Sequence, residues 1–520
     1  MDMIDSKYLL TDEQMMDFIA KGYVVLQNDL PEQLHTSVMD KIYHVLHEEG
    51  NPGNNILPRV PEIQQFFETP VVKGALTSIL GPDHYMHPHR HCHYNQPGNQ
   101  TPGGGEWHKD GYWSAMRSHR PWWAMILYYT QDITEDLGPT AVMPGTQYYE
   151  KFIGDRGETL LPTGKAGTMV LIHFDLWHKA SYNITNMDRY MLKFQFVRLR
   201  APEYPTWNHQ SSEMVVPDGT PFVHLNLWKD NWDWLRGEST PSKVDKSVSE
   251  TQLVQLAQDL RSGEESVRAR AADEIGLLGE AGSALAPELG DLLNDIEVVA
   301  LNAAYALGHM GAKGVDVLLH HIADGTTLVA TRAAYGLQGA SIAAIPGLLK
   351  LLEEHPKEKR RALAAFVLGM IGPLAHETVP ALILSLEDES PWVRRNAIEA
   401  MGMIGNAGGQ AGNALCQALE DSIVCESVEG GNANDVSNQS HIMNKIGYTA
   451  ALSLLRASRE NDAPTILGSL ELALHSKDRY VRAYAFEALT HLRTDEAVDI
   501  LIRYYRTSRW CPDTSKASTF

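Results

Sequence analysis

The sequence predicts a multidomain protein in which a β-rich N-terminal domain precedes an all-α solenoid. The chain of 520 residues changes character near residue 240: most of its tryptophans lie before that point, and alanine- and leucine-rich segments follow it. Turn-forming residues at 237–242 predict a linker between the two parts. The expected parts are a first domain at 1–236, a linker at 237–249, a solenoid at 250–508 and a C-terminal tail at 509–520.

The N-terminal part combines a few helices with many short strand-like runs. Thr11 and Gln14 form the capping-box pattern, which predicts a helix that begins after Thr11 and stops at Gly22. Further helices are expected near 32–48 and 61–79. Short aromatic and β-branched runs between Gly and Pro turns predict strands at 23–26, 87–94, 124–130, 169–173 and 190–199. This pattern favours an all-β barrel or sandwich with flanking helices.

The C-terminal part repeats itself. Segments with the pattern of Val267–Ala272 recur along it, and each is followed by a glycine where a helix is expected to end. Four of these glycines, Gly279, Gly311, Gly372 and Gly405, predict a period of about 30 to 33 residues with one degenerate copy in the longest gap. This period is typical of stacked helix pairs, and residues 250–507 resemble HEAT-like repeats. The Gly/Asn/Ser-rich segment 428–440 predicts a long loop between repeats.

Composition excludes several classes of protein. The net charge of −21 leaves no basic footprint, so nucleic-acid binding is not expected. Four widely spaced cysteines without a CxxC motif fit a reducing compartment, and we expect a cytoplasmic protein without a disulfide framework. The acidic N-terminus lacks a signal-peptide pattern, and no run of about 18 apolar residues predicts a membrane span.

Two histidines and an aspartate have the spacing of a metal site. His108 and Asp110 lie two residues apart, so on one strand their side chains share a face while Lys109 points away. His178 is expected from a distant strand or from the end of one, across the barrel. Two imidazoles and one carboxylate suit Fe(II), because a facial set of three ligands leaves three positions open for a bidentate 2-oxo acid and for O2. A structural His–Asp pair is the alternative for an isolated motif of this kind.

The order of several motifs resembles the phytanoyl-CoA dioxygenase-like family of Fe(II)/2-oxoglutarate oxygenases over about residues 8–200. The motifs are the helix and strand at 10–26, the stretch 103–111 around His108 and Asp110, the turn 138–147, the stretch 167–178, and then Asn183 and Arg189. The resemblance implies a double-stranded β-helix (jelly-roll, cupin-like) fold with iron held by His108, Asp110 and His178. It also implies that Arg189 pairs with the distal carboxylate of 2-oxoglutarate and that Asn183 belongs to the cosubstrate site. Two positions depart from the family: Gln147 replaces a common histidine, and Ala180 replaces a small hydroxyl residue.

Aromatic side chains beside the ligands are candidates for a substrate pocket. They are Tyr112, Trp113 and Trp177, with packing in the core as the alternative. His87, His89, His91 and His93 alternate along one expected strand and share a face. His91 and His93 are the further pocket candidates, and a second metal site is the alternative for this row.

The family resemblance implies a dioxygenase that hydroxylates an unactivated C–H bond of a small organic molecule and releases succinate and CO2. Desaturation or ring closure stays open, whereas Asp110 disfavours halogenation because a halide needs the position that its carboxylate fills. A protein hydroxylase whose HEAT-like repeats recruit a protein substrate is one alternative. A scaffold with a vestigial oxygenase domain is another, and the repeats could also cap or dimerise the catalytic half.

Overall fold

The chain folds into two compact units. The computed structural model describes residues 4–98, 103–111, 113–154, 159–220, 223–238, 248–405, 408–428, 446–459 and 462–507. The first unit comprises residues 1–111 and 117–347, and the second comprises residues 112–116 and 348–520. Most of the expected linker and the whole expected tail lie outside the described residues, as does nearly all of the expected loop at 428–440.

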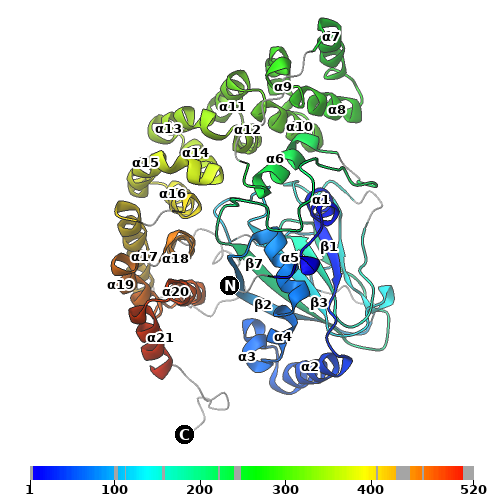
Figure 1. Ribbon diagram of the computed structural model, residues 1–520, viewed down its shortest axis with the longest axis vertical. Helices are drawn as coiled ribbons and strands as arrows, with labels where there is room; N and C mark the ends of the chain where they lie inside the picture. The colour runs from blue at the N-terminus through cyan, green and yellow to red at the C-terminus, as the bar shows by residue number, and fades with distance from the viewer. Residues whose placement is uncertain are drawn as a thin grey trace. The chain divides into compact units, whose positions relative to one another are not determined.

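The N-terminal part of the first unit is built on two antiparallel sheets. Strands β1, β2, β3 and β7 of the larger sheet are labelled in Figure 1. The larger sheet has the strand order β1-β5-β3-β7-β2, and the smaller sheet pairs β4 with β6. The strands are β1 (Tyr23–Gln27), β2 (His84–Asn95), β3 (Trp123–Tyr129), β4 (Thr140–Val142), β5 (Thr168–His173), β6 (His178–Ala180) and β7 (Arg189–Arg198). The expected β-rich N-terminal domain and helical C-terminal region are therefore confirmed.

The two faces of the larger sheet have different surroundings. Because successive side chains of a strand point to opposite faces, alternate residues of β7 divide between them. On one face, Phe194 stacks on Phe67 of α4 (Ile63–Phe67) with ring centroids 4.3 Å apart. The other face carries Arg189 and Lys193 of β7, whose cross-strand neighbours on β2 are Asn95 and His91. Two cationic side chains therefore share the sheet face that is turned away from α4.

The helices of this part lie before β1 and between β1 and β2 in the chain, and their ends follow local sequence signals. The capping box of Thr11 and Gln14 is present, and Gly22 ends α1 in the left-handed region at φ 82°. The helix expected at 61–79 is divided, because Thr69 caps a new helix that has Pro70 in its first turn. The helices are α1 (Asp12–Lys21), α2 (Glu32–His44), α3 (Ile56–Arg59), α4 (Ile63–Phe67) and α5 (Pro70–Leu80).

The first unit also contains the first helical repeats. Helices α8, α10 and α12 pack side by side, and α6 packs against α8 and α10. We call α8, α10 and α12 the inner row. The helices are α6 (Leu225–Leu235), α7 (Glu250–Asp259), α8 (Glu265–Gly276), α9 (Ala286–Leu292), α10 (Glu297–Gly308), α11 (Ala312–Asp324) and α12 (Thr327–Gly339). The sequence patterns do not predict α6, a helix in which Trp228, Trp232 and Trp234 are all buried.

A polar cluster joins α6 to the inner row. Asp273 of α8 accepts hydrogen bonds from the backbone N–H groups of Leu225 and Asn226, which lie in the first turn of α6. Arg120 forms a bidentate pair with Asp230 of α6, at 3.0 and 3.2 Å, and donates to the carbonyl of Gln338 in α12. Since these side chains are buried, each charged or polar group needs its partner, and α6 is fixed on the repeats.

The second unit consists of further repeats together with the short segment 112–116. Arg395 of α16 donates to the Trp113 carbonyl at 2.7 Å, and Glu399 of the same helix accepts the N–H of Ala115 at 2.6 Å. The helices are α14 (Glu358–Ile371), α15 (Val379–Leu384), α16 (Pro391–Ile404), α17 (Gln410–Val428), α18 (Ile446–Ala457), α19 (Ala463–Ala473), α20 (Arg479–Leu492) and α21 (Asp495–Thr507). Helix α13 (Ile345–Glu354) spans the boundary between the units.

One stretch of the described residues, Glu358–Glu387, is long and apolar enough to cross a membrane by length and composition alone. Half of its most apolar window is buried inside the protein, and a kink at Ala375 separates α14 from α15. These properties fit a pair of core helices in a repeat, so the described residues show no clear membrane span. Cys92 and Cys416 are buried free thiols, and the cytoplasmic location stays a prediction.

Candidate metal centre

The three expected metal ligands meet in the first unit. One ligand atom from each of His108, Asp110 and His178 lies within 4.8 Å of the other two. His108 and His178 form an isolated antiparallel bridge, with backbone N–O distances of 3.0 and 3.1 Å in the two directions. The strand pattern predicts His178 across the barrel from His108, but the structure places it directly beside His108, at the first residue of β6.

Both imidazoles are held so that one ring nitrogen faces the centre. Nδ1 of His108 lies 2.8 Å from the Glu106 carbonyl, and Nδ1 of His178 lies 2.9 Å from the Leu176 carbonyl. A carbonyl only accepts, so each Nδ1 carries the proton and each Nε2 keeps its lone pair. Nε2 of His178 is buried and has no hydrogen-bond partner among the described residues. An orphaned buried nitrogen of this kind fits a metal ligand.

Asp110 is the charged member of the cluster. Its Oδ2 contacts the ammonium group of Lys193, and its Oδ1 lies 3.7 Å from Nε2 of His178. Burial raises the pKa of Asp110, but the charge of Lys193 and the contact with His178 outweigh it and hold the pKa well below its usual range. The carboxylate is therefore ionised, as a metal ligand must be. The set of two imidazoles and one carboxylate fits Fe(II).

Lys193 is a site residue that the sequence motifs do not identify. Its side chain is 10% exposed, and it lies four residues after Arg189 on the same strand. Residues separated by four on a strand share a face, so the spacing alone places Lys193 on the face of the sheet that Arg189 occupies. The spacing of Arg189 and Lys193 in the sequence could therefore have identified Lys193 as a site residue. The motifs used to find the site do not contain it.

Arg189 is buried at the start of β7. Its Nε donates to the Gly138 carbonyl at 3.1 Å, and its Nη1 donates to the His93 carbonyl at 3.4 Å. Burial lowers the pKa of Arg189, since the surrounding protein disfavours the charged form. Two carbonyls thus fix the plane of the guanidinium. The same turn that supplies Gly138 is packed closely against residues 181–183.

Asn183 lies near Arg189 but is engaged with the backbone. Its amide nitrogen donates to the carbonyls of Asn95 and Met187, at 3.1 and 2.7 Å, and its side-chain oxygen accepts from Thr185. This side chain therefore holds the turn between β6 and β7. Gln147, one of the two departures from the family pattern, donates to the Ile19 carbonyl near the end of α1.

The histidines of β2 divide at a register shift between Met86 and Arg90. His87 is fully buried, with its ring 5.3 Å from that of Trp123. His91 is half-buried and His93 is exposed, and their ring centroids lie 6.2 Å apart. Among the described residues, the one cluster with metal-site geometry is that of His108, Asp110 and His178, and none of the β2 histidines belongs to it.

The aromatic pocket candidates lie in different places. Trp177 donates from Nε1 to the Tyr149 carbonyl at 3.1 Å, and the Lys109 ammonium lies 5.8 Å from its ring centroid. Trp113 is buried in the second unit, where its ring lies 4.6 Å from that of Tyr480. Tyr112 lies outside the described residues.

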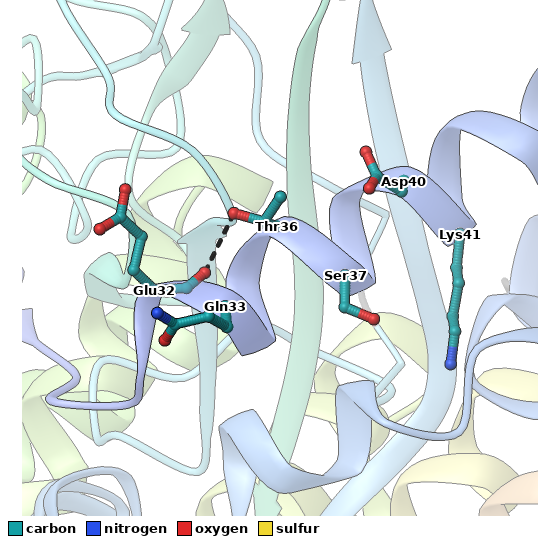
Figure 2. A pocket seen from close by; sticks show the side chains of 6 residues that line it. All are labelled: Glu32, Gln33, Thr36, Ser37, Asp40 and Lys41. Atoms are coloured by element: carbon teal, nitrogen blue, oxygen red, sulfur yellow. Dashed lines mark hydrogen bonds between the residues drawn. The ribbon is translucent and has the colours of Figure 1, made fainter.

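A shallow hollow lies on the exposed side of α2 (Figure 2). It is lined by Glu32, Gln33, Thr36, Ser37, Asp40 and Lys41. Thr36 donates from its hydroxyl to the Glu32 carbonyl, which is an ordinary contact within the helix. None of the metal-site residues lines this hollow.

Comparisons with known proteins agree with the expected resemblance. The family model described as phytanoyl-CoA dioxygenase matches residues 20–191, and the model described as HEAT repeats matches residues 345–426. Both expected resemblances are confirmed, and the first supports a 2-oxoglutarate-dependent oxygenase. A search of curated proteins finds no match.

Two examples illustrate the solved structures that are similar to parts of this chain. One is the non-heme α-ketoglutarate-dependent carbocyclase SnoK from nogalamycin biosynthesis, which is 16% identical over 38% of this chain and 87% of its own, with a TM-score of 0.32. The other is EctD from S. alaskensis with 2-oxoglutarate and 5-hydroxyectoine, which is 18% identical over 37% of this chain and 78% of its own, with a TM-score of 0.30.

Proposed function

We propose that this chain, whose residues 20–191 match the phytanoyl-CoA dioxygenase family, is an Fe(II)- and 2-oxoglutarate-dependent dioxygenase that hydroxylates a C–H bond of a small organic molecule. The observation that carries the proposal is the cluster of His108, Asp110 and His178, in which both imidazoles present Nε2 to one point beside an ionised carboxylate. These three residues would hold Fe(II), which would supply the oxidising chemistry for an unactivated C–H bond, with 2-oxoglutarate and O2 consumed and succinate and CO2 formed. The two antiparallel sheets support a double-stranded β-helix as the fold.

Arg189 is the proposed partner of the distal carboxylate of 2-oxoglutarate. A guanidinium forms planar, charge-assisted contacts with a carboxylate, and the Gly138 and His93 carbonyls already fix its plane. Asn183 supports this site indirectly, since its side chain holds the turn beside Gly138. The cosubstrate would lie along the sheet face that carries Arg189 and Lys193.

Two features of this sheet face support the proposed chemistry. Lys193 holds the second carboxylate oxygen of Asp110, which leaves Oδ1 on the side of His178. Leu127 of β3 is the cross-strand neighbour of Lys193 and is fully buried, so an apolar side chain lies beside the charged pair. Electrostatic contacts beside such an apolar side chain are stronger than in open solvent.

The inner row of helices is already covered by other parts of the same chain, which favours a small-molecule substrate over a protein substrate. Helices α8 and α10 pack against α6, and Asp273 of α8 accepts the backbone N–H of Leu225 in α6. The Tyr305 hydroxyl of α10 contacts His119 in the β-rich part. This part of the solenoid is therefore occupied by the chain itself. Recruitment of a protein by the repeats is the second candidate, motivated by the HEAT match at 345–426. The complete ligand set and Arg189 argue against a vestigial domain.

The reaction class is tested by succinate formation in full-length protein reconstituted with Fe(II), 2-oxoglutarate and O2. We expect wild-type protein to convert 2-oxoglutarate into succinate, slowly without substrate and faster when a substrate from a small-molecule library is added. Asp110→Ala should lose this activity, and Asp29→Ala, at an exposed position, should keep it. Equal turnover in wild-type protein and Asp110→Ala would rule out the proposed site.

A further inference from the structure

The two segments that carry the metal ligands meet at one guanidinium. Arg117 donates from Nη2 to the backbone carbonyl of Asp110 at 2.6 Å, and its Nη1 contacts the carboxylate of Asp175. The Asp175 side chain is 2% exposed and lies next to Leu176, whose carbonyl orients His178. A single side chain therefore ties the backbone of Asp110 to the turn that precedes His178.

The segment that carries Arg117 is anchored on the inner row of repeats. The Tyr335 hydroxyl of α12 donates to the Arg117 carbonyl at 3.1 Å. Two residues later, the His119 ring stacks on Tyr335 at a centroid distance of 3.9 Å, and its Nδ1 lies 2.8 Å from the Tyr305 hydroxyl of α10. His119, Tyr305 and Tyr335 are all buried. All these residues belong to the first compact unit.

A second contact leads from α10 towards His178. Glu297, the first residue of α10, accepts hydrogen bonds from the backbone N–H groups of Glu150 and Lys151, at 2.6 and 3.4 Å. The neighbouring Tyr149 carbonyl accepts the indole N–H of Trp177 at 3.1 Å. Since Trp177 directly precedes His178, the repeats hold both ligand segments through separate contacts.

We propose that Arg117 is a positioning residue through which helices α10 and α12 set the geometry of the metal ligands. The first repeats are thus a structural part of the centre and not an independent appendage. The inference rests on the proposed function, because it takes His108, Asp110 and His178 to hold a metal. Contacts behind the ligands orient them, and their loss typically weakens metal affinity by about 10- to 100-fold. The contacts of Arg117 are charge-assisted, which makes them the strong members of this chain of contacts.

The test compares Co(II) binding by full-length variants. Arg117→Gln removes the charge, and Tyr335→Phe removes one hydroxyl without changing the shape of the ring. Arg270→Gln and Tyr204→Phe are the matched controls, since Arg270 and Tyr204 are exposed. The readouts are the Co(II) dissociation constant from calorimetry, the visible spectrum of the Co(II) protein and the midpoint of thermal unfolding.

We expect Arg117→Gln to raise the Co(II) dissociation constant by about 10- to 100-fold and to alter the spectrum. Tyr335→Phe should raise the constant by about 2- to 10-fold, the effect of one hydrogen bond, and both controls should match wild type. Wild-type affinity and spectrum in both variants would overturn the proposal, even if their thermal midpoints fell. If Arg117→Gln does not fold, wild-type Co(II) affinity and spectrum in Tyr335→Phe alone would overturn the proposal. A wild-type protein that binds no Co(II) contradicts the proposed function itself.

Discussion

His108 and His178 exchange two backbone hydrogen bonds, of 3.0 and 3.1 Å, and their imidazole centroids lie 4.6 Å apart. Main-chain pairing thus brings together two ligands that are seventy residues apart in the sequence. Within the described part of the chain Asp110 has no such pairing, and its position depends on contacts with the side chains of Lys193 and Arg117. The centre should therefore be most sensitive to substitutions around Asp110.

Lys193→Met should make the metal-free protein less stable. Removing the ammonium leaves the Asp110 carboxylate partly buried without its counter-charge, and breaking such a pair costs about 3 to 5 kcal/mol when it is fully buried. A divalent ion restores the counter-charge, so Co(II) should raise the thermal midpoint more in Lys193→Met than in wild type. Scanning fluorimetry with and without Co(II) measures this difference. Lys165→Met, at a lysine that is 83% exposed, is the control, and an equal Co(II) shift in both proteins would contradict the prediction.

Arg189→Lys should weaken binding of 2-oxoglutarate. Lysine cannot reproduce the planar pair of donors, and the loss of one hydrogen bond to a charged group is worth about 1.5 to 3 kcal/mol. The KM for 2-oxoglutarate should rise by about 10- to 100-fold, with a smaller change in kcat, as measured by succinate formation. The exposed substitution Arg261→Lys should leave KM unchanged. An unaltered KM in Arg189→Lys would assign the cosubstrate carboxylate to another residue.

Gly138→Ala should disturb the same site through the backbone. Gly138 has φ 73°, and a Cβ there would lie 2.8 Å from the carbonyl oxygens of Ser181 and Tyr182. Because the Gly138 carbonyl accepts from Arg189, the shift should raise the KM for 2-oxoglutarate and lower the thermal midpoint by a few degrees, as expected for about 1 to 3 kcal/mol of strain. Gly219→Ala is the matched control, since Gly219 has φ 70° and open space around it. A KM effect of equal size in the control would refute the link to Arg189.

The burial of His224 leads us to expect that the folded protein loses stability as the pH falls. Its Nδ1 donates to Asn302 of α10, its Nε2 accepts from the Tyr149 hydroxyl, and burial lowers its pKa to about 4. Between pH 6.5 and 4 the unfolded chain binds a proton here that the folded chain does not, so stability falls as the pH falls. One such group contributes about 3 kcal/mol over this range.

The measurement is the thermal midpoint at pH 6.5 and at pH 4.5. The decrease should be smaller in His224→Gln than in wild type. His320→Gln, at a histidine that is 68% exposed, should behave like wild type. An identical pH dependence in His224→Gln and wild type would show that this imidazole does not carry the effect.

Local signals in the sequence predict much of the fold. The capping box at Thr11, the glycine at Gly22 and the aromatic runs of β3 and β7 act over a few residues, and each gives the expected element. Helix α6 is not predicted, because its tryptophans pack on rings from other parts of the chain: Trp232 lies 5.3 Å from Trp207 and Trp234 lies 5.6 Å from Trp122, between ring centroids. The first repeats also pack into one unit with the β-rich part. The sequence does not predict this packing, because it too depends on contacts between distant parts of the chain.

The candidate site also contains some residues that the sequence predicts and others that only the structure reveals. The order of His108, Asp110 and His178 identifies the ligands, and strand alternation would have added Lys193. No local pattern places His178 beside His108, since their bridge depends on the fold. Arg117 could not be found from spacing either, because its role depends on Asp175 and on Tyr335 of a repeat. Residues that touch the metal are predictable from motifs, whereas those behind them require the structure.

Anaerobic titration of Fe(II) and 2-oxoglutarate into metal-free protein tests the central claim most directly. One Fe(II) should bind per chain, and adding 2-oxoglutarate should produce the visible charge-transfer band of a 2-oxo acid chelated to Fe(II). The same titration of His178→Ala and Asp110→Ala should show no stoichiometric binding and no band. If both variants bind Fe(II) and develop the band as wild type does, His108, Asp110 and His178 do not form the metal centre.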